Sequence, residues 1–177
     1  SDSLGAVARF GRGDVQWLTA GQGIVHAEMF PLLAIDSDNP LELFQIWLNL
    51  PARNKMVAPH FTMFWSQDIP HRITQDDAGR STEVAVIAGR LADAGAPLPP
   101  PPDSWASQAD ADVSIWTLRM DPGARWTLPA AAGAGTQRSL YFFKGHSISV
   151  AGEAISSHAA LALRGDCAVA LVNTGSS

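Results

Sequence analysis

The sequence predicts an all-β protein, and three observations support this. Apolar and polar residues alternate with a period of two in LELFQIWLNL, residues 41–50, as in a half-buried strand. Turn signals such as Asp121-Pro122-Gly123 separate further short runs rich in β-branched and aromatic residues. No long segment carries a convincing helical period. Many short strands with frequent turns indicate a β-sandwich or barrel.

The expected strands can be placed in chain order. An early strand should carry the segment Val25-His26-Ala27-Glu28, which follows a glycine-containing run. The next strand is expected at 43–50, where Phe44, Ile46 and Leu48 share one face. Four later segments are rich in strand-forming residues, and we expect strands there as well: 113–120, 139–143, 147–150 and 167–173.

Composition and charge limit the function. The 177 residues suffice for one ordinary domain or two small ones, and 46% of them are apolar. A net charge of −5, with no basic stripe, argues against direct binding of nucleic acid. No run approaches the roughly 18 apolar residues of a membrane helix, so no membrane partner is expected.

The single cysteine, Cys167, excludes an internal disulfide and favours a reducing compartment, which we take to be the cytoplasm. Cys167 alternates with Val169 and Leu171, so we expect an inert thiol buried on a core strand. The chain opens without methionine and has no apolar signal-peptide core, so we expect it to belong to a longer protein.

His26 and Glu28 are the candidate metal ligands. Residues i and i+2 of a strand point to the same side, so both side chains can face one barrel mouth. Imidazole and carboxylate together suit a first-row divalent metal. On these two residues alone, a surface pair or a hydrogen-bonded histidine is the more common explanation. A hydrogen-bonded structural role is also expected for His60 and His71, while Gln16 and Trp17 lie on the strand that leads into the motif.

The residues around this pair resemble a known family. Gly13, Thr19-Ala20-Gly21 and the following histidine are similar to the second conserved motif of cupins, with a longer spacer. More specifically, GDVQWLTAGQGIVHAE, residues 13–28, resembles the signature of the pirin family, whose members are bicupins. The resemblance continues through most of the chain, in LFQIWLNLPARNKMVAP, SQDIP, VAVIAGRL, LRMDPGARWTLP and RSLYFFKG.

The resemblance implies a fold and a ligand set. The fold would be two tandem double-stranded β-helix (cupin) barrels, both incomplete here: residues 1–65 as the latter part of the N-terminal cupin and 66–177 as the C-terminal cupin. In pirins the histidine and glutamate of this motif are two of four ligands of one metal, most often iron as Fe²⁺. The other two come from an upstream His-x-His motif that this sequence lacks, and the family's last strands are also missing. The chain is then either trimmed at both ends or a degenerate member with half a site. We expect trimming, because the retained half of the site is intact.

The second cupin is expected to bind no metal. Leu128 and Ala130 stand about where cupin histidines would follow the Pro-Gly turn, and Arg138 stands three residues before Tyr141, where a glutamate would be. None of these side chains is an ordinary ligand of a divalent ion. The proline-rich stretch 96–103 would then be a loop of this second cupin and not a linker between domains.

The resemblance implies two alternative functions. One is a metal-dependent dioxygenase acting on flavonols such as quercetin, with O₂ as co-substrate. In it His26 would be a neutral ligand, and Glu28 both a ligand and the catalytic acceptor of the substrate's proton. The other is a non-enzymatic regulatory protein, in which an iron redox switch controls the binding of a protein partner. A substrate-sized cavity with an open coordination position would favour the enzyme, and a closed site beside a charged patch would favour the regulator.

Overall fold

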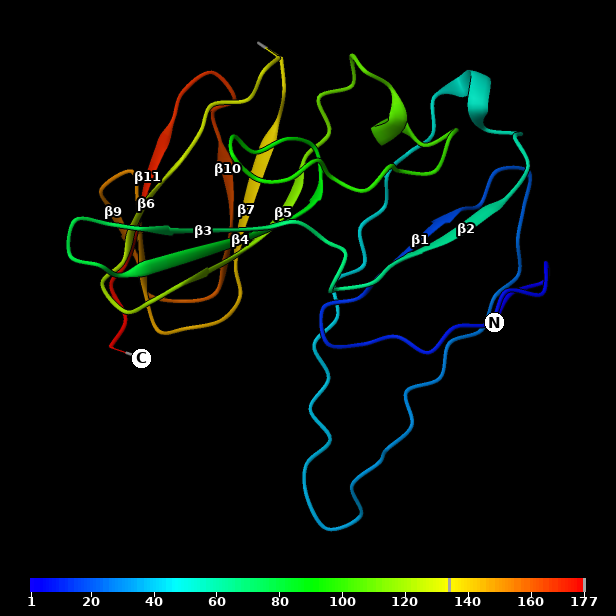
Figure 1. Cartoon of the computed structure of the whole chain (residues 1–177), viewed down its shortest axis with the longest axis horizontal. Coiled ribbons are helices and arrows are strands. Elements are labelled where there is room, and N and C mark those ends of the chain that lie inside the picture. Colours follow the sequence, from blue (N-terminus) through cyan, green and yellow to red (C-terminus); the bar gives the residue numbers. More distant parts are fainter. Residues whose placement is uncertain (134, 177) are drawn as a thin grey trace. The chain divides into compact units, whose positions relative to one another are not determined.

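The computed structural model describes residues 1–133 and 135–176, and these residues form strands, loops and two short 3₁₀ helices (Figure 1). No α-helix occurs among them, which confirms the all-β prediction. No helix in this part of the chain is long and apolar enough to cross a membrane. The chain divides into two compact units, described separately below. One comprises Ser1–Ser66 with Pro99–Gln108, and the other Gln67–Leu98 with Ala109–Ser177.

The first unit is built on one antiparallel pair of strands. Strand β1, Val15–Thr19, pairs with β2, His60–Phe64, so that Val15 lies opposite Phe64. The rings of Trp17 and Phe64 pack with their centroids 5.7 Å apart, and the Phe64 side chain is buried. The two 3₁₀ helices, η1 at Ala52–Asn54 and η2 at Trp105–Ser107, also belong to this unit.

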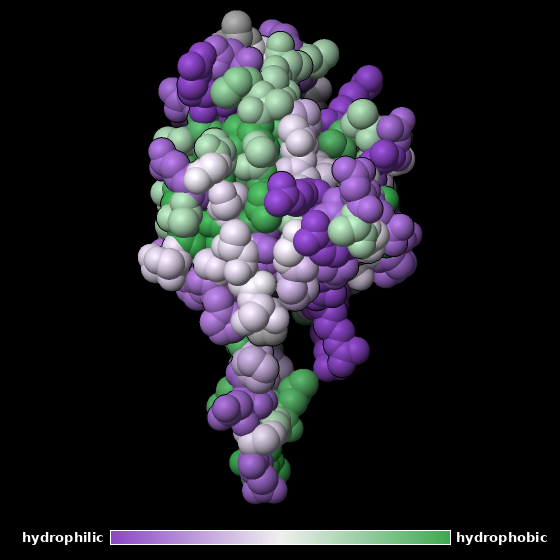
Figure 2. All heavy atoms as spheres, turned by 90° about the vertical axis from the view of Figure 1, so that its left-hand side faces the viewer, coloured by the Kyte–Doolittle hydropathy of each residue, from purple (hydrophilic) through white to green (hydrophobic). Residues whose placement is uncertain are grey.

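The strand expected at 43–50 is absent, so this prediction was wrong. The segment is irregular and lies in the long connection between β1 and β2 (Figure 1). The part of this connection that extends from the bottom of the molecule has apolar and polar side chains interspersed on its surface (Figure 2). Trp47, for example, is 87% exposed. The alternating pattern is real, but a strand also needs a neighbouring backbone to pair with. No strand lies beside this segment in the described residues.

The proline-rich stretch is divided between the two units. Pro99–Gln108 groups with the first unit and residues 96–98 with the second, and the assignment of the stretch to a loop of the second cupin stays a prediction. Within the first unit, Nδ2 of Asn54 donates a hydrogen bond to the carbonyl oxygen of Asp103 over 3.0 Å, and Arg53 donates to Oε1 of Gln108 over 2.9 Å. These hydrogen bonds hold η2 near η1.

The described residues of the second unit form three antiparallel sheets. The first has the order β3-β4-β5, from His71–Gln75, Ser81–Ala88 and Ile115–Met120. The second has the order β6-β11-β8-β9, from Arg125–Leu128, Val169–Asn173, Ile148–Val150 and Glu153–Ile155. The third pairs β10, Ala159–Leu163, with β7, Arg138–Phe142. The strands predicted near 113–120, 139–143, 147–150 and 167–173 are thus confirmed.

A hydrophobic cluster lies inside the second unit. Ile148, Val150, Val169 and Leu171 are buried at its centre. Side chains from all three sheets pack around them: Leu118, Met120, Trp126, Leu128, Leu140, Phe142, Ile155, Leu161 and Leu163. Antiparallel sheets that surround a single apolar interior are what a cupin barrel requires.

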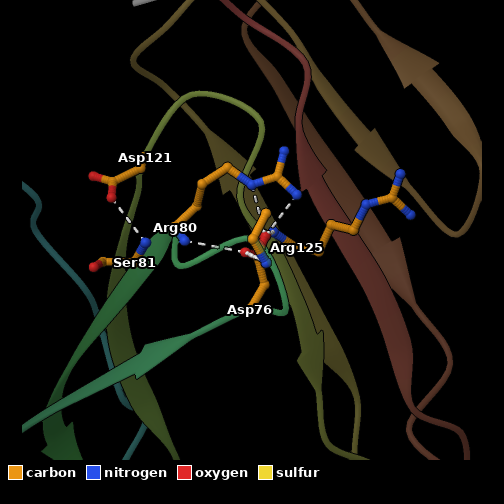
Figure 3. A network of polar contacts seen from close by, with 6 residues as sticks. Asp76, Arg80, Ser81, Asp121 and Arg125 are labelled. Atoms are coloured by element: carbon orange, nitrogen blue, oxygen red, sulfur yellow. Dashed lines mark hydrogen bonds and ion pairs between the residues drawn. The ribbon is translucent and has the colours of Figure 1, made fainter.

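A polar network joins two of these sheets (Figure 3). Asp76 lies in the turn between β3 and β4, and its Oδ1 accepts hydrogen bonds from the backbone amides of Ala78 and Arg80. Its Oδ2 accepts from the Arg80 guanidinium at 2.9 Å and from the amide of Arg125, the first residue of β6, at 3.1 Å. The Asp76 side chain is only 7% exposed.

This network makes the stability of the second unit depend on pH. Desolvation alone would raise the pKa of Asp76, but the amides of Arg80, Ala78 and Arg125 and the Arg80 side chain outweigh it and lower the pKa below 3.8. A lowered folded-state pKa stabilises fully above the unfolded value, and this stabilisation disappears as the pH falls through the folded-state pKa. We expect Asp76→Asn to lower the denaturation midpoint at pH 7 and to flatten its decline below about pH 4.

The measurement is a series of denaturant titrations from pH 7 to pH 2. Asp77→Asn is the matched control, because Asp77 is an exposed carboxylate in the same turn. Equal acid sensitivity in Asp76→Asn and the unmodified protein would show that the network does not contribute.

Candidate metal centre

The chain turns sharply between β1 and the His26 segment. After Thr19, Gly21 and Gly23 both adopt positive φ, at +53° and +129°. The amide of Gln22, between them, donates to the carbonyl oxygen of Val57 over 2.9 Å. A Cβ atom on Gly21 would collide with that carbonyl, whereas a Cβ on Gly23 would meet nothing within 4 Å. Gly21 is therefore needed both for its backbone conformation and for the close approach of Val57, whereas Gly23 is needed for its backbone conformation alone.

Alanine at each position separates the two requirements. Gly23→Ala is expected to cost about 1–3 kcal/mol of unfolding free energy, because only the backbone conformation is strained. Gly21→Ala should cost more than Gly23→Ala, because the Val57 segment must also move. Urea denaturation of both variants tests this difference, and equal losses would contradict the close approach to Val57.

His26 lies in an isolated antiparallel bridge with Asp2. The amide of Ser3 donates to the carbonyl of Val25 over 2.7 Å, and the amide of Ala27 donates to the carbonyl of Ser1 over 2.9 Å. We expected a continuous strand through His26 and Glu28, and this is corrected to a single bridge. The bridge hydrogen bonds still hold the backbone at His26 in the antiparallel arrangement.

His26 and Glu28 line the same small surface hollow, with a cavity volume of about 10 Å³. Gln16, Leu18 and Phe61, from β1 and β2, line its other side, and Asp2 also faces it. Both His26 and Glu28 are exposed residues. Nε2 of Gln16 donates to Oε1 of Glu28 over 3.3 Å, so β1 helps to orient the carboxylate.

Asp2 is the residue of this hollow that sequence reasoning missed. Its Oδ1 accepts hydrogen bonds from the amides of Leu4 and Ala6, at 2.9 and 3.0 Å. Its Oδ2 is buried and has no hydrogen-bond partner. Only the register of the bridge, which depends on residues 24 positions apart, brings Asp2 beside His26. No short-range pattern could have indicated it.

The side chains of the hollow include the right types of metal ligand, but too few of them for a complete metal site. An imidazole nitrogen and a carboxylate oxygen, directed to one hollow, suit a first-row divalent ion. Within residues 1–133 and 135–176, however, no group of three or more His, Cys, Asp or Glu side chains is arranged to hold an ion. His26 and Glu28 would therefore supply two ligands, and the remaining ligands would have to come from outside these residues.

Several residues of the second unit to which the sequence analysis gave no metal-binding or catalytic role make structural contacts. Leu128 packs against the core, and Arg138 donates to the carbonyl oxygens of Pro129 and Cys167, at 2.6 and 3.3 Å. Cys167 lies in a bend before β11 and is half-buried, which corrects the prediction of a buried thiol on a core strand. Nδ1 of His71 lies 2.8 Å from Oε1 of Glu83, so the expected hydrogen bond of His71 is confirmed.

The antiparallel sheets and the His26 motif together define a protein of the cupin class. The family model described as Pirin matches residues 1–48, the part of the chain that includes β1, Asp2, His26 and Glu28. The chain belongs to the pirin family.

Individual relatives agree with this assignment. A Pseudomonas aeruginosa protein named "Putative quercetin 2,3-dioxygenase" is 33% identical over 132 residues, which are 75% of this chain and 42% of that protein. A Vibrio cholerae protein with the same descriptive name is 35% identical over 66% of this chain and 42% of its own length. Mouse "Pirin" is 43% identical over 50% of this chain and 27% of its own length. The chain thus spans less than half the length of these relatives, and no solved structure matches it significantly.

Proposed function

We propose that this chain is part of a metal-dependent dioxygenase of the pirin family that acts on flavonols such as quercetin. The observation that carries the proposal is that His26 and Glu28, in the segment that matches the family, line one hollow. Relatives named "Putative quercetin 2,3-dioxygenase" support the substrate class. We further propose that residues 1–65 belong to the metal-binding cupin and 66–177 to a cupin without metal, and that the protein works in the cytoplasm.

Each side chain of the hollow has a role in this proposal. His26 would bind the ion, most often Fe²⁺ in this family, through a neutral ring nitrogen. Glu28, oriented by Gln16, would bind the same ion and accept the proton of the substrate's hydroxyl group. The ion, when bound, supplies a Lewis acid that polarises the substrate oxygen and brings O₂ close to it.

The size of the hollow favours a second candidate function. Its cavity volume of about 10 Å³ is far below the roughly 300–1,000 Å³ typical of small-molecule sites. His26 and Glu28 are both exposed, as residues of a surface that binds a partner protein would be. The alternative is therefore an iron-dependent, redox-sensing regulatory protein without enzymatic activity.

Oxygen uptake distinguishes the two functions. Iron-loaded protein, with its iron content measured, is mixed with quercetin in an oxygen electrode, and the quercetin absorbance is followed in parallel. We expect both oxygen and quercetin to be consumed, with no consumption by metal-free protein. A fully loaded protein that consumes neither would favour the regulatory function.

A further inference from the structure

The proline-rich part of the first unit has an exposure pattern that repeats every three residues. Pro99, Pro102 and Trp105 are exposed, whereas Pro101 and Ser104 are buried. Positions 100 and 103, between the exposed and the buried residues, are half-buried. A polyproline II helix has three residues per turn, so side chains three positions apart lie along one edge of it. The pattern is therefore that of a polyproline II helix with one edge packed inward and one edge facing solvent.

The sequence itself dictates this conformation. Residues 99–102 are four consecutive prolines. Each proline ring fixes its own φ near −65°, and each proline also forces the residue before it into an extended ψ. Ser104, which follows the prolines, has φ −65° and ψ 148°, close to the polyproline II values of about −75° and +145°.

Hydrogen bonds hold this helix in place. Oγ of Ser107 donates to the carbonyl oxygen of Pro102 over 2.6 Å. Nδ2 of Asn54, from η1, donates to the carbonyl oxygen of Asp103 over 3.0 Å. A partner that binds the solvent-facing edge would meet a segment that is already ordered, so little conformational entropy is lost on binding.

The exposed edge, formed by Pro99, Pro102 and Trp105, indicates what kind of partner fits. Its two prolines are three residues apart, which is about 9 Å along a polyproline II helix. Aromatic-lined grooves of proline-recognition domains bind prolines with this spacing. Trp105, which is 44% exposed, continues the edge with another apolar surface. The half-buried Asp103 adds a carboxylate next to Pro102, so a complementary groove carries a basic residue at that end.

We propose that the exposed edge is a docking site for a proline-recognition domain with an aromatic-lined groove and a basic residue at the end that meets Asp103. Pro99 and Pro102 fill the groove. None of these residues lines the hollow of His26 and Glu28, so the proposal does not depend on the metal site.

The first test measures binding of the whole chain to a panel of purified SH3, WW and EVH1 domains, by biolayer interferometry. We expect a domain with a basic groove end to bind, and Pro99→Ala and Pro102→Ala each to weaken its binding about tenfold. Pro40→Ala is the matched control, because Pro40 is an exposed proline of the same unit outside the edge. Circular dichroism checks that each variant is folded. The absence of binding across the panel, or equal affinity in all three variants, would overturn the proposal.

The second test examines the charge and the place of contact with the domain that binds best. Asp103→Asn should weaken binding about threefold and reduce its dependence on salt, because an exposed ion pair is lost. The indole N–H signal of Trp105 should shift in ¹H–¹⁵N spectra as the domain is added. An unchanged salt dependence in Asp103→Asn would contradict the basic residue, and an unmoved Trp105 signal at saturation would place the contact elsewhere.

Discussion

In a full-length protein that supplies the remaining ligands, replacing His26 by alanine is expected to abolish tight metal binding and to leave the fold intact. The imidazole of His26 is one of the two metal ligands that we assign in the hollow, so its loss leaves Glu28 as the remaining assigned ligand. His26 is exposed, and the bridge to Asp2 is made by backbone atoms, so the substitution removes little buried contact. The measurement is metal content per protein after iron loading and desalting, combined with far-UV circular dichroism.

His60→Ala is the matched control for this experiment. His60 is also an exposed histidine of the first unit, at the start of β2, and it is not among the residues lining the hollow. We expect it to retain the iron of the unmodified protein. Equal iron in His26→Ala would refute the metal site and the dioxygenase proposal that depends on it.

Leu171→Ala should destabilise the second unit by about 2–5 kcal/mol, the usual cost of a large-to-small change in a core. Leu171 is 1% exposed and lies on the central strand β11, opposite Trp126 of β6 and Val150 of β8. The cavity left by three missing carbons would border both neighbouring strands. The measurement is the unfolding free energy from chemical denaturation.

Ile73→Ala on β3 is the control for this substitution. Ile73 is another large aliphatic residue on a strand of the same unit, but it is 66% exposed. Its replacement should change the unfolding free energy by no more than about 0.5 kcal/mol. A loss as large as that of Leu171→Ala would show that the core of this unit is not centred on β11.

The strands that the sequence predicted in the second unit, β5, β7, β8 and β11, form because their partners lie in the same described chain. Ile115–Met120, for example, has both the β-branched and aromatic composition of a strand and a neighbour, β4, to pair with. Residues 43–50 have an equally clear alternation, yet they form no strand because no partner lies beside them. The alternation of apolar and polar residues shows only that a segment's side chains would suit a sheet. Whether the segment pairs with another strand depends on residues that are distant in the sequence.

The candidate site was predictable only in part, for a related reason. His26 and Glu28 are two positions apart in a recognisable motif, so the sequence indicates both. Asp2 and Gln16 reach the hollow through the His26 bridge and through β1, and their positions depend on registers that a single sequence does not reveal. For Cys167 the predicted strand began two residues too early, since β11 starts at Val169. Element ends are decided by hydrogen bonds that are weakly encoded in composition.

The Asp76 carboxylate has a consequence for how the second unit unfolds. It binds the turn between β3 and β4 and also the first amide of β6, which belongs to a different sheet. A fluctuation that opens this turn therefore also releases the edge of the other sheet, and neither sheet can loosen independently at this point. In hydrogen exchange, the amides of Arg80 and Arg125 should thus become accessible in the same opening event, as members of one foldon.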